Sequence, residues 1–132
     1  MALYLDSSAL VKLIAVEKES DKLEAYIGGR EIVSSEIART EVVRAVVRRH
    51  AGLGEAAEDL LADLGLVVVN TVVTMAAAWI RPMTLRSLDA LHVASARRLE
   101  GDLEALVTYD RRMIEAGQMA GLPVASPGGQ AA

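Results

Sequence analysis

The sequence predicts an α/β fold in which a mostly parallel sheet of about five short strands is covered by helices on both faces. Short apolar segments alternate with helical patterns along the whole chain, which is typical of βαβ units. The apolar segments lack polar alternation, so we expect strands that are buried on both faces. With 132 residues, no internal repeat and no linker, the chain is expected to form a single domain over residues 1–132.

The elements are expected where apolar runs and capping signals alternate. The predicted strands lie at residues 1–5, 31–34, 66–69, 105–109 and, as an edge strand, 123–126. The predicted helices lie at residues 7–16, 20–28, 36–50, 55–64, 70–79, 87–99 and 110–117. The expected N-caps are Ser7 or Ser8, Ser20, Ser35, Asn70 or Thr71, and Ser87. Glycines at positions 28, 65, 101 and 117 are expected to end helices.

Composition restricts the chemistry that the chain can perform. The absence of cysteine excludes disulfides and thiolate zinc sites, and two histidines are too few for an imidazole-rich metal centre. Any metal would therefore be bound by oxygen. A net charge of −4 argues against a broadly basic surface, although doubled arginines at positions 48, 97 and 111 allow local basic patches. The hydrophobic content of 52% suggests an apolar subunit interface, so we expect a homodimer.

The sequence gives no indication of a membrane protein. The N-terminus lacks the basic region of a signal peptide. The longest apolar stretch, residues 66–80, is interrupted by Asn70, Thr71 and Thr74 and is shorter than the ~20 residues that a spanning helix needs. We therefore expect a cytoplasmic protein with no membrane partner.

Four acidic residues stand where ligands bind in open parallel sheets. Asp6 and Asp110 follow the first and fourth predicted strands, and Glu41 and Asp89 lie on helices at or beside apolar faces. Acids at strand ends can share one crevice with acids from flanking helices. If four carboxylates meet within ~5 Å, each pair costs about 3 kcal/mol at an effective dielectric of ~20, so protons or a cation must bind. Mg²⁺, or Mn²⁺ as a substitute, suits such an oxygen site.

Each acid also has a structural interpretation that the sequence leaves open. Asp6 and Asp110 could be N-caps, and Glu41 could form an ion pair with Arg44. Asp89 in the first turn of its helix would be favoured by the helix dipole. Around the acids, Ser8 and Thr108 could orient a water or a phosphate, or could only cap backbone. His92, one turn beyond Asp89, could form an acid/base dyad with it, but is interpreted as a packed residue with a local hydrogen bond. The basic residues nearest to the acids along the sequence are Lys12, Arg44, Arg48, Arg111 and Arg112.

Four segments that contain these acids resemble one known family. They are residues 3–13 around Asp6, 40–45 around Glu41, 87–94 around Asp89 and 106–113 around Asp110. In this order, and in a chain of this length, they closely resemble the PIN-domain ribonucleases, specifically the VapC toxins of VapBC toxin–antitoxin modules. The resemblance covers nearly the whole chain. It implies a three-layer α/β/α PIN-like fold with a five-stranded parallel sheet.

The resemblance also implies an activity and partners. Asp6, Glu41, Asp89 and Asp110 would be the metal-binding catalytic acids, with Thr108 as the accompanying hydroxyl. The expected reaction is Mg²⁺-dependent cleavage of structured RNA, such as tRNA or rRNA, by a metal-activated water. The expected partner is a VapB-like antitoxin whose tail fills the groove and places an Arg or Lys among the acids.

Two other functions are compatible with the sequence. A catalytically silent PIN-like scaffold would bind a partner and use its acids as caps. A receiver-type signalling domain is also an α/β unit with acids that bind Mg²⁺, but it needs an Asp after the third strand, where this chain has Val69 and Asn70.

Overall fold

The computed structural model describes residues 1–129 and contains one five-stranded sheet in the order β3-β2-β1-β4-β5, in which every pairing is parallel. The strands are β1 (Ala2–Leu5), β2 (Glu31–Ser35), β3 (Gly65–Val67), β4 (Leu103–Val107) and β5 (Val124–Ala125). All five were predicted, with ends that differ by up to two residues. The parallel α/β fold is therefore confirmed.

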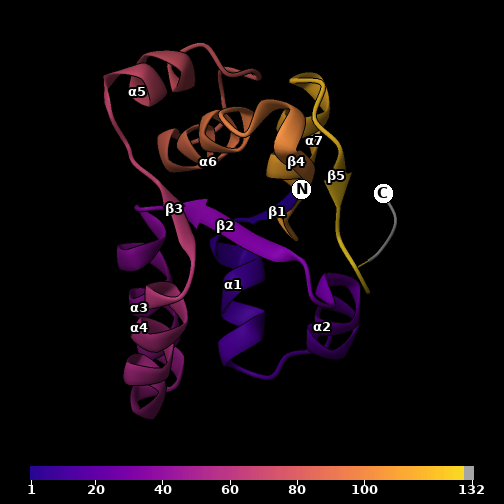
Figure 1. Ribbon diagram of the computed structural model, residues 1–132. Coiled ribbons are helices and arrows are strands. Elements are labelled where there is room, and N and C mark those ends of the chain that lie inside the picture. Colours follow the sequence, from indigo (N-terminus) through magenta and orange to yellow (C-terminus); the bar gives the residue numbers. More distant parts are fainter. Residues whose placement is uncertain (130–132) are drawn as a thin grey trace.

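Within residues 1–129, seven α-helices form the two outer layers of the fold (Figure 1). They are α1 (Ser7–Ile14), α2 (Ser20–Ile27), α3 (Ala38–Arg49), α4 (Gly54–Ala62), α5 (Thr71–Ala77), α6 (Ser87–Arg97) and α7 (Arg111–Met119). Short 3₁₀ turns lie at Ala51–Leu53 and Glu100–Asp102. Helices α1 to α4 cover one face of the sheet and α5 to α7 cover the other. Within residues 1–129, no helix is long and apolar enough to cross a membrane.

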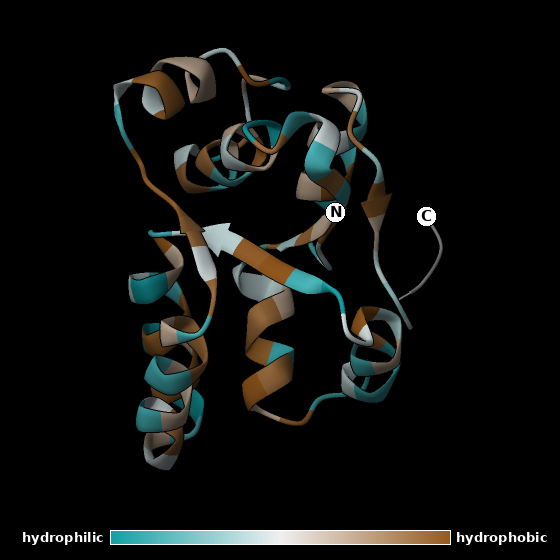
Figure 2. Cartoon of the chain, viewed as in Figure 1, coloured by the Kyte–Doolittle hydropathy of each residue, from teal (hydrophilic) through white to brown (hydrophobic). Residues whose placement is uncertain are grey.

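The central strand β1 is buried on both faces. Leu3 and Leu5 pack into the core beneath α1 to α4, whereas Ala2 and Tyr4 pack into the core beneath α5 to α7. This alternation follows from the two-residue period of a strand. Helix α1, which lies against the sheet, is correspondingly mostly hydrophobic along its length (Figure 2). Tyr4 therefore points toward α6, and its hydroxyl lies 2.7 Å from Nδ1 of His92 on that helix.

Some helix starts differ from the predicted ones. The N-cap of α1 is Asp6, whose carboxylate accepts a hydrogen bond from the Ala9 amide, so the alternative of Asp6 as the cap is confirmed and that of Ser7 or Ser8 was wrong. Asp6 has the extended backbone of a cap (φ −77°, ψ −179°), whereas Ser7 and Ser8 are already helical. Ser87 is likewise the first residue of α6 rather than its cap, which is Arg86. Asn70 caps α5 as expected.

The ends of β1 and β4 bring distant segments together. These two strands are neighbours at the centre of the sheet, and the Asp6 amide donates to the Val107 carbonyl at 3.2 Å. The residues that follow the two strands, Asp6 and Thr108, consequently lie side by side. Because α3 follows β2 and α7 follows β4, their first turns are also at this carboxyl edge of the sheet.

Candidate active site

Asp6 is the buried acid at the end of the central strand, with 2% of its surface exposed. One oxygen, Oδ1, accepts hydrogen bonds from Ser8 Oγ at 2.7 Å and from the Ala9 amide at 3.0 Å, and Oδ2 accepts one from Thr108 Oγ1 at 2.6 Å. No ion pair reaches this carboxylate within residues 1–129. Burial raises the pKa of Asp6, and His92 and the hydrogen bonds offset this only in part.

Asp89 and Asp110 interact through their charges. Asp89, in the first turn of α6, is buried and receives a hydrogen bond from Arg86 Nε at 3.4 Å. Burial raises the pKa of Asp89, Arg86 lowers it and the charge of Asp110 raises it, so the net direction is upward. Asp110 caps α7 and accepts from the Arg112 amide at 2.8 Å and the Met113 amide at 3.4 Å. Asp89 thus lies in the first turn of α6 and Asp110 at the N-cap of α7.

Glu41 is bound by residues from two other elements. Its Oε1 accepts a hydrogen bond from Ser7 Oγ at 2.7 Å and lies 2.7 Å from His92 Nε2. Burial alone raises the pKa of Glu41, but His92, Ser7 and Arg86 together lower it, so the group is held ionised. None of the ion pairs within residues 1–129 joins Glu41 to Arg44, and the partner of Glu41 is His92 instead.

The four acids lie around one edge of the sheet, but their side chains do not form a compact cluster. Within residues 1–129, no three His, Asp or Glu side chains are grouped closely enough to hold a metal ion as they stand. Each acid is instead held by hydrogen bonds from the chain itself. Thr108 and Ser8 hold Asp6, and Ser7 and His92 hold Glu41. Arg86 holds Asp89, and the first turn of α7 holds Asp110. The four acids are thus not gathered into a ready-made metal site within residues 1–129.

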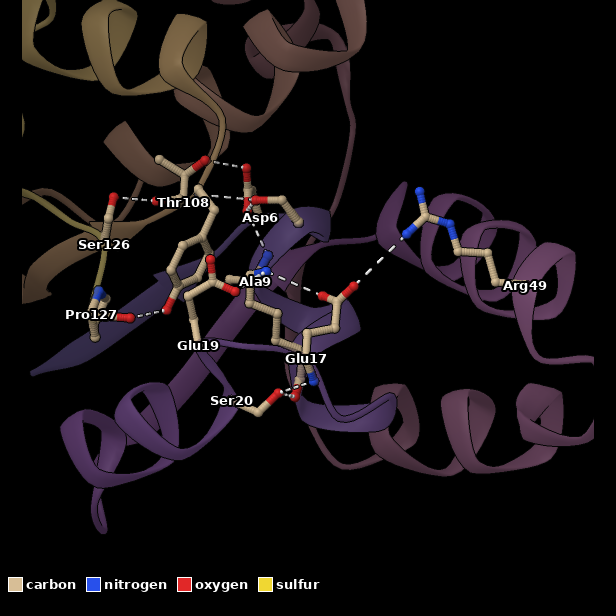
Figure 3. A network of polar contacts seen from close by, with 12 residues as sticks. Asp6, Ala9, Glu17, Glu19, Ser20, Arg49, Thr108, Ser126 and Pro127 are labelled. Carbon is tan, nitrogen blue, oxygen red and sulfur yellow. Dashed lines mark hydrogen bonds and ion pairs between the residues drawn. The ribbon is translucent and has the colours of Figure 1, made fainter. Parts of the chain in front are cut away.

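Lys12 is near Asp6 in the sequence but is occupied by other partners. Its Nζ lies 3.2 Å from Glu17 and 2.9 Å from Glu19, and 4.7 Å from the centre of the Tyr109 ring. Figure 3 shows this network beside Asp6 and Thr108. The Tyr109 hydroxyl donates to the Pro127 carbonyl at 2.7 Å, and burial, with the charges of Glu19 and Asp6, raises its pKa to about 12. Lys12 is therefore a structural residue here.

Three side chains at this edge, those of Tyr4, Ser7 and Arg86, were not identified from the sequence as part of the site, and His92 was interpreted there as a packed residue. Tyr4 Oη lies 2.7 Å from His92 Nδ1, so His92 bonds to groups that are distant in sequence, and the expectation of a local hydrogen bond was wrong. Ser7 bonds to Glu41 rather than to backbone, and Arg86 lies against Asp89. Arg86 and His92 are each three residues from Asp89, which places them near it on a helix. That spacing was the available signal.

The family follows from comparison with known proteins. The model of the PIN domain family matches residues 3–118 of this chain. The chain belongs to the PIN domain family. This membership excludes the receiver-domain alternative and confirms the resemblance on which the site assignment was based.

Curated relatives are similar over almost their full length. Ribonuclease VapC46 of Mycobacterium tuberculosis is 45% identical over 127 residues, which cover 96% of this chain and 98% of the relative. Ribonuclease VapC47 of the same species is 37% identical over 132 residues, with 96% and 97% covered. These similarities place the chain in the VapC branch of the PIN family.

Solved structures with low sequence identity share the fold. VapBC2 from Rickettsia felis, bound to a DNA fragment from their promoter, has a TM-score of 0.72 at 16% identity and covers 96% of this chain and 99% of that chain. VapC20 from Mycobacterium tuberculosis, described as a sarcin-ricin loop cleaving toxin, has a TM-score of 0.74 at 15% identity, with 87% and 95% covered. The three-layer PIN-like arrangement is therefore confirmed.

Proposed function

We propose that this chain is a divalent-metal-dependent endoribonuclease toxin that cleaves structured RNA and uses Mg²⁺, or Mn²⁺ in its place. The ribonuclease class follows from the VapC branch of the PIN family, and the metal, the site residues and the kind of RNA are the proposed part. The observation that carries the proposal is the buried carboxylate of Asp6, which has no ion-pair partner within residues 1–129 and shares the carboxyl edge of the sheet with three further acids.

The donor chemistry of the site fits a hard divalent cation. All candidate ligands are carboxylate oxygens, which Mg²⁺ and Mn²⁺ prefer. Asp6 is buried, and burial raises the pKa of both Asp6 and Asp89, so a bound cation would favour their ionised forms. A cation bound mainly by Asp6 and Asp89, with Glu41 and Asp110 binding through water or a second ion, would compensate their negative charge. Its binding would compete with Arg86 for Asp89.

The chain's own residues would prepare the site for hydrolysis. When bound, the cation lowers the pKa of a water molecule and neutralises charge that develops on the phosphate. Thr108 and Ser8 fix the orientation of Asp6 through both of its oxygens. The Thr108 hydroxyl also accepts a hydrogen bond from the Asp110 amide at 3.1 Å, which ties the start of α7 to Asp6. These contacts preorganise two of the four acids.

Basic side chains around the acids would bind the phosphates of RNA. Arg86 is 71% exposed at its side chain, and Arg111 and Arg112 are exposed at the first turn of α7. A cavity of about 350 Å³ lies between the segment before α6 and α7 and is lined by Pro82, Thr84, Leu85, Arg112 and Glu115. Two of its lining residues are near the acids along the chain: Leu85 directly precedes Arg86, and Arg112 is two residues after Asp110. Contacts to phosphate give affinity without sequence specificity.

We further propose two protein partners. An exposed apolar surface on and beside α5, where Val72, Met75 and Trp79 are more than half exposed, would serve a homodimer. A VapB-like antitoxin would bind near the acids and place an Arg or Lys side chain where Arg86 now contacts Asp89. The occurrence of this fold in solved toxin–antitoxin complexes supports such a partner. We place the protein in the cytoplasm, where its RNA substrates are.

Cleavage of total RNA tests this function. The purified chain is expected to cut a small number of structured sites in total RNA in the presence of Mg²⁺, and chelation by EDTA should abolish all of them. Sequencing the new 5′ ends locates the sites, and the Asp89→Asn variant provides the inactive control. A silent scaffold would give no new ends with the wild-type chain. Identical ends from the Asp89→Asn variant would instead contradict the site assignment.

A further inference from the structure

A buried chain of hydrogen bonds connects the core to Glu41. Tyr4 Oη lies 2.7 Å from His92 Nδ1, and His92 Nε2 lies 2.7 Å from Glu41 Oε1. Tyr4 is fully buried on β1, and His92 on α6 is 1% exposed. The two rings also meet edge to face, with centroids 5.9 Å apart. The sheet, α6 and α3 thus converge on one carboxylate.

The chemistry of the two end groups fixes the tautomer of a neutral His92. An ionised Glu41 carboxylate can only accept, so Nε2 must carry the proton that bonds to it. Nδ1 is then an acceptor, and the Tyr4 hydroxyl donates to it. Each of these three side chains therefore has one donor or acceptor role toward its neighbour.

We propose that His92, oriented by Tyr4, is a positioning residue that presents the Glu41 carboxylate to the divalent cation. This inference rests on the proposed function. The contacts from His92 and Ser7 both fall on Oε1, and within residues 1–129 no hydrogen bond is made to Oε2. The Glu41 side chain is 22% exposed, so the carboxylate is anchored through one oxygen and partly accessible. Carboxylates that bind a metal are themselves usually hydrogen-bonded by neighbouring side chains, and these outer partners orient the ligands.

A metal-binding measurement on position 92 tests the proposal directly. His92→Leu fills the buried space but removes the donor, and it is expected to weaken Mn²⁺ binding about tenfold or more. His92→Gln can place an amide N–H near Nε2 and should recover most of that affinity. Titration of the purified chain with Mn²⁺ alone, followed by calorimetry, gives the dissociation constants. His50→Gln, at the exposed second histidine, is the matched control and should bind like the wild type.

A double variant tests whether His92 acts through Glu41. Glu41→Gln should itself weaken Mn²⁺ binding, and adding His92→Leu to it should change affinity less than about twofold. If the two losses instead multiply, His92 does not act through Glu41 and the proposal is overturned. If Glu41→Gln leaves affinity unchanged, the assignment of Glu41 under the proposed function fails instead, so the two failures are distinct.

The tautomer can be measured without any variant. Long-range ¹H–¹⁵N spectra of the metal-free wild-type chain, which has only two histidines, should show His92 protonated at Nε2 and not at Nδ1. Tyr4→Phe should change this pattern and weaken Mn²⁺ binding less than His92→Leu does. A ring protonated at Nδ1 would overturn the proposal. Unchanged Mn²⁺ affinity in a folded His92→Leu variant, as judged by circular dichroism, would do the same.

Discussion

Asp6→Asn is expected to lower the rate of RNA cleavage by about a thousandfold or more and to leave the fold intact. Asp6 carries the buried negative charge at the centre of the proposed site. An Asn side chain keeps an oxygen that can cap α1 by accepting from the Ala9 amide, but it does not carry the charge that binds a cation. The measurement is the single-turnover rate on an RNA mapped as a substrate, with circular dichroism as the test of folding.

The control for this variant is another Asp→Asn change far from the site. Asp59 is exposed on α4, so Asp59→Asn should cleave at the wild-type rate. Asp89→Asn should resemble Asp6→Asn, because the two acids are assigned to the same cation. A folded Asp6→Asn variant that retains more than about a tenth of the wild-type rate contradicts the assignment, since losing a main ligand should cost far more.

Without divalent cations, the acids should make stability depend on pH in an unusual direction. Burial raises the pKa of both Asp6 and Asp89. In the window between their unfolded and folded pKa values the native state binds more protons than the unfolded chain. Stability from these two groups is therefore present at low pH and is lost as the pH rises through their folded pKa values. The pKa of Glu41 is lowered, so the stability that Glu41 contributes is present at higher pH and is lost as the pH falls through its folded pKa.

The Asp6→Asn variant isolates the contribution of Asp6. In EDTA at neutral pH it should have a higher free energy of unfolding than the wild type, and this difference should shrink as the pH falls. Adding Mg²⁺ should reverse the order, because a cation at 100 times its dissociation constant stabilises the wild type by about 2.7 kcal/mol. Urea unfolding at several pH values, with and without Mg²⁺, measures both effects. If the difference in free energy of unfolding between the two proteins is the same at every pH, with and without Mg²⁺, this explanation is contradicted.

The sequence was sufficient for the fold because its signals were local and consistent. Apolar runs without alternation predicted buried parallel strands, and β1 is indeed covered on both faces. The errors concern residues with two possible roles. Asp6, Ser7 and Ser8 are all good caps, and only the path of the backbone at Asp6 decided that the acid is the cap and that Ser7 turns to Glu41.

The partners of the acids could not be predicted from the sequence. Strand ends and helix faces indicated where Asp6, Glu41, Asp89 and Asp110 would lie. The bond between Glu41 and His92, however, joins residues 51 positions apart, on different helices. A local pair with Arg44 was the only candidate that spacing could offer. Thr108 was identified as a possible partner of the site, but its bond to both Asp6 and the Asp110 amide depends on the pairing of β1 with β4.

The central claim is that acids from separate elements bind one divalent cation at the carboxyl edge of the sheet. A crystal of this chain grown with Mn²⁺ tests it, because the anomalous signal locates the ion independently of the protein atoms. We predict a peak within about 2.0–2.5 Å of carboxylate oxygens of Asp6 and Asp89, with Arg86 displaced from Asp89. Full Mn²⁺ occupancy elsewhere on the surface, with the acids still bonded as in the metal-free chain, would contradict the claim.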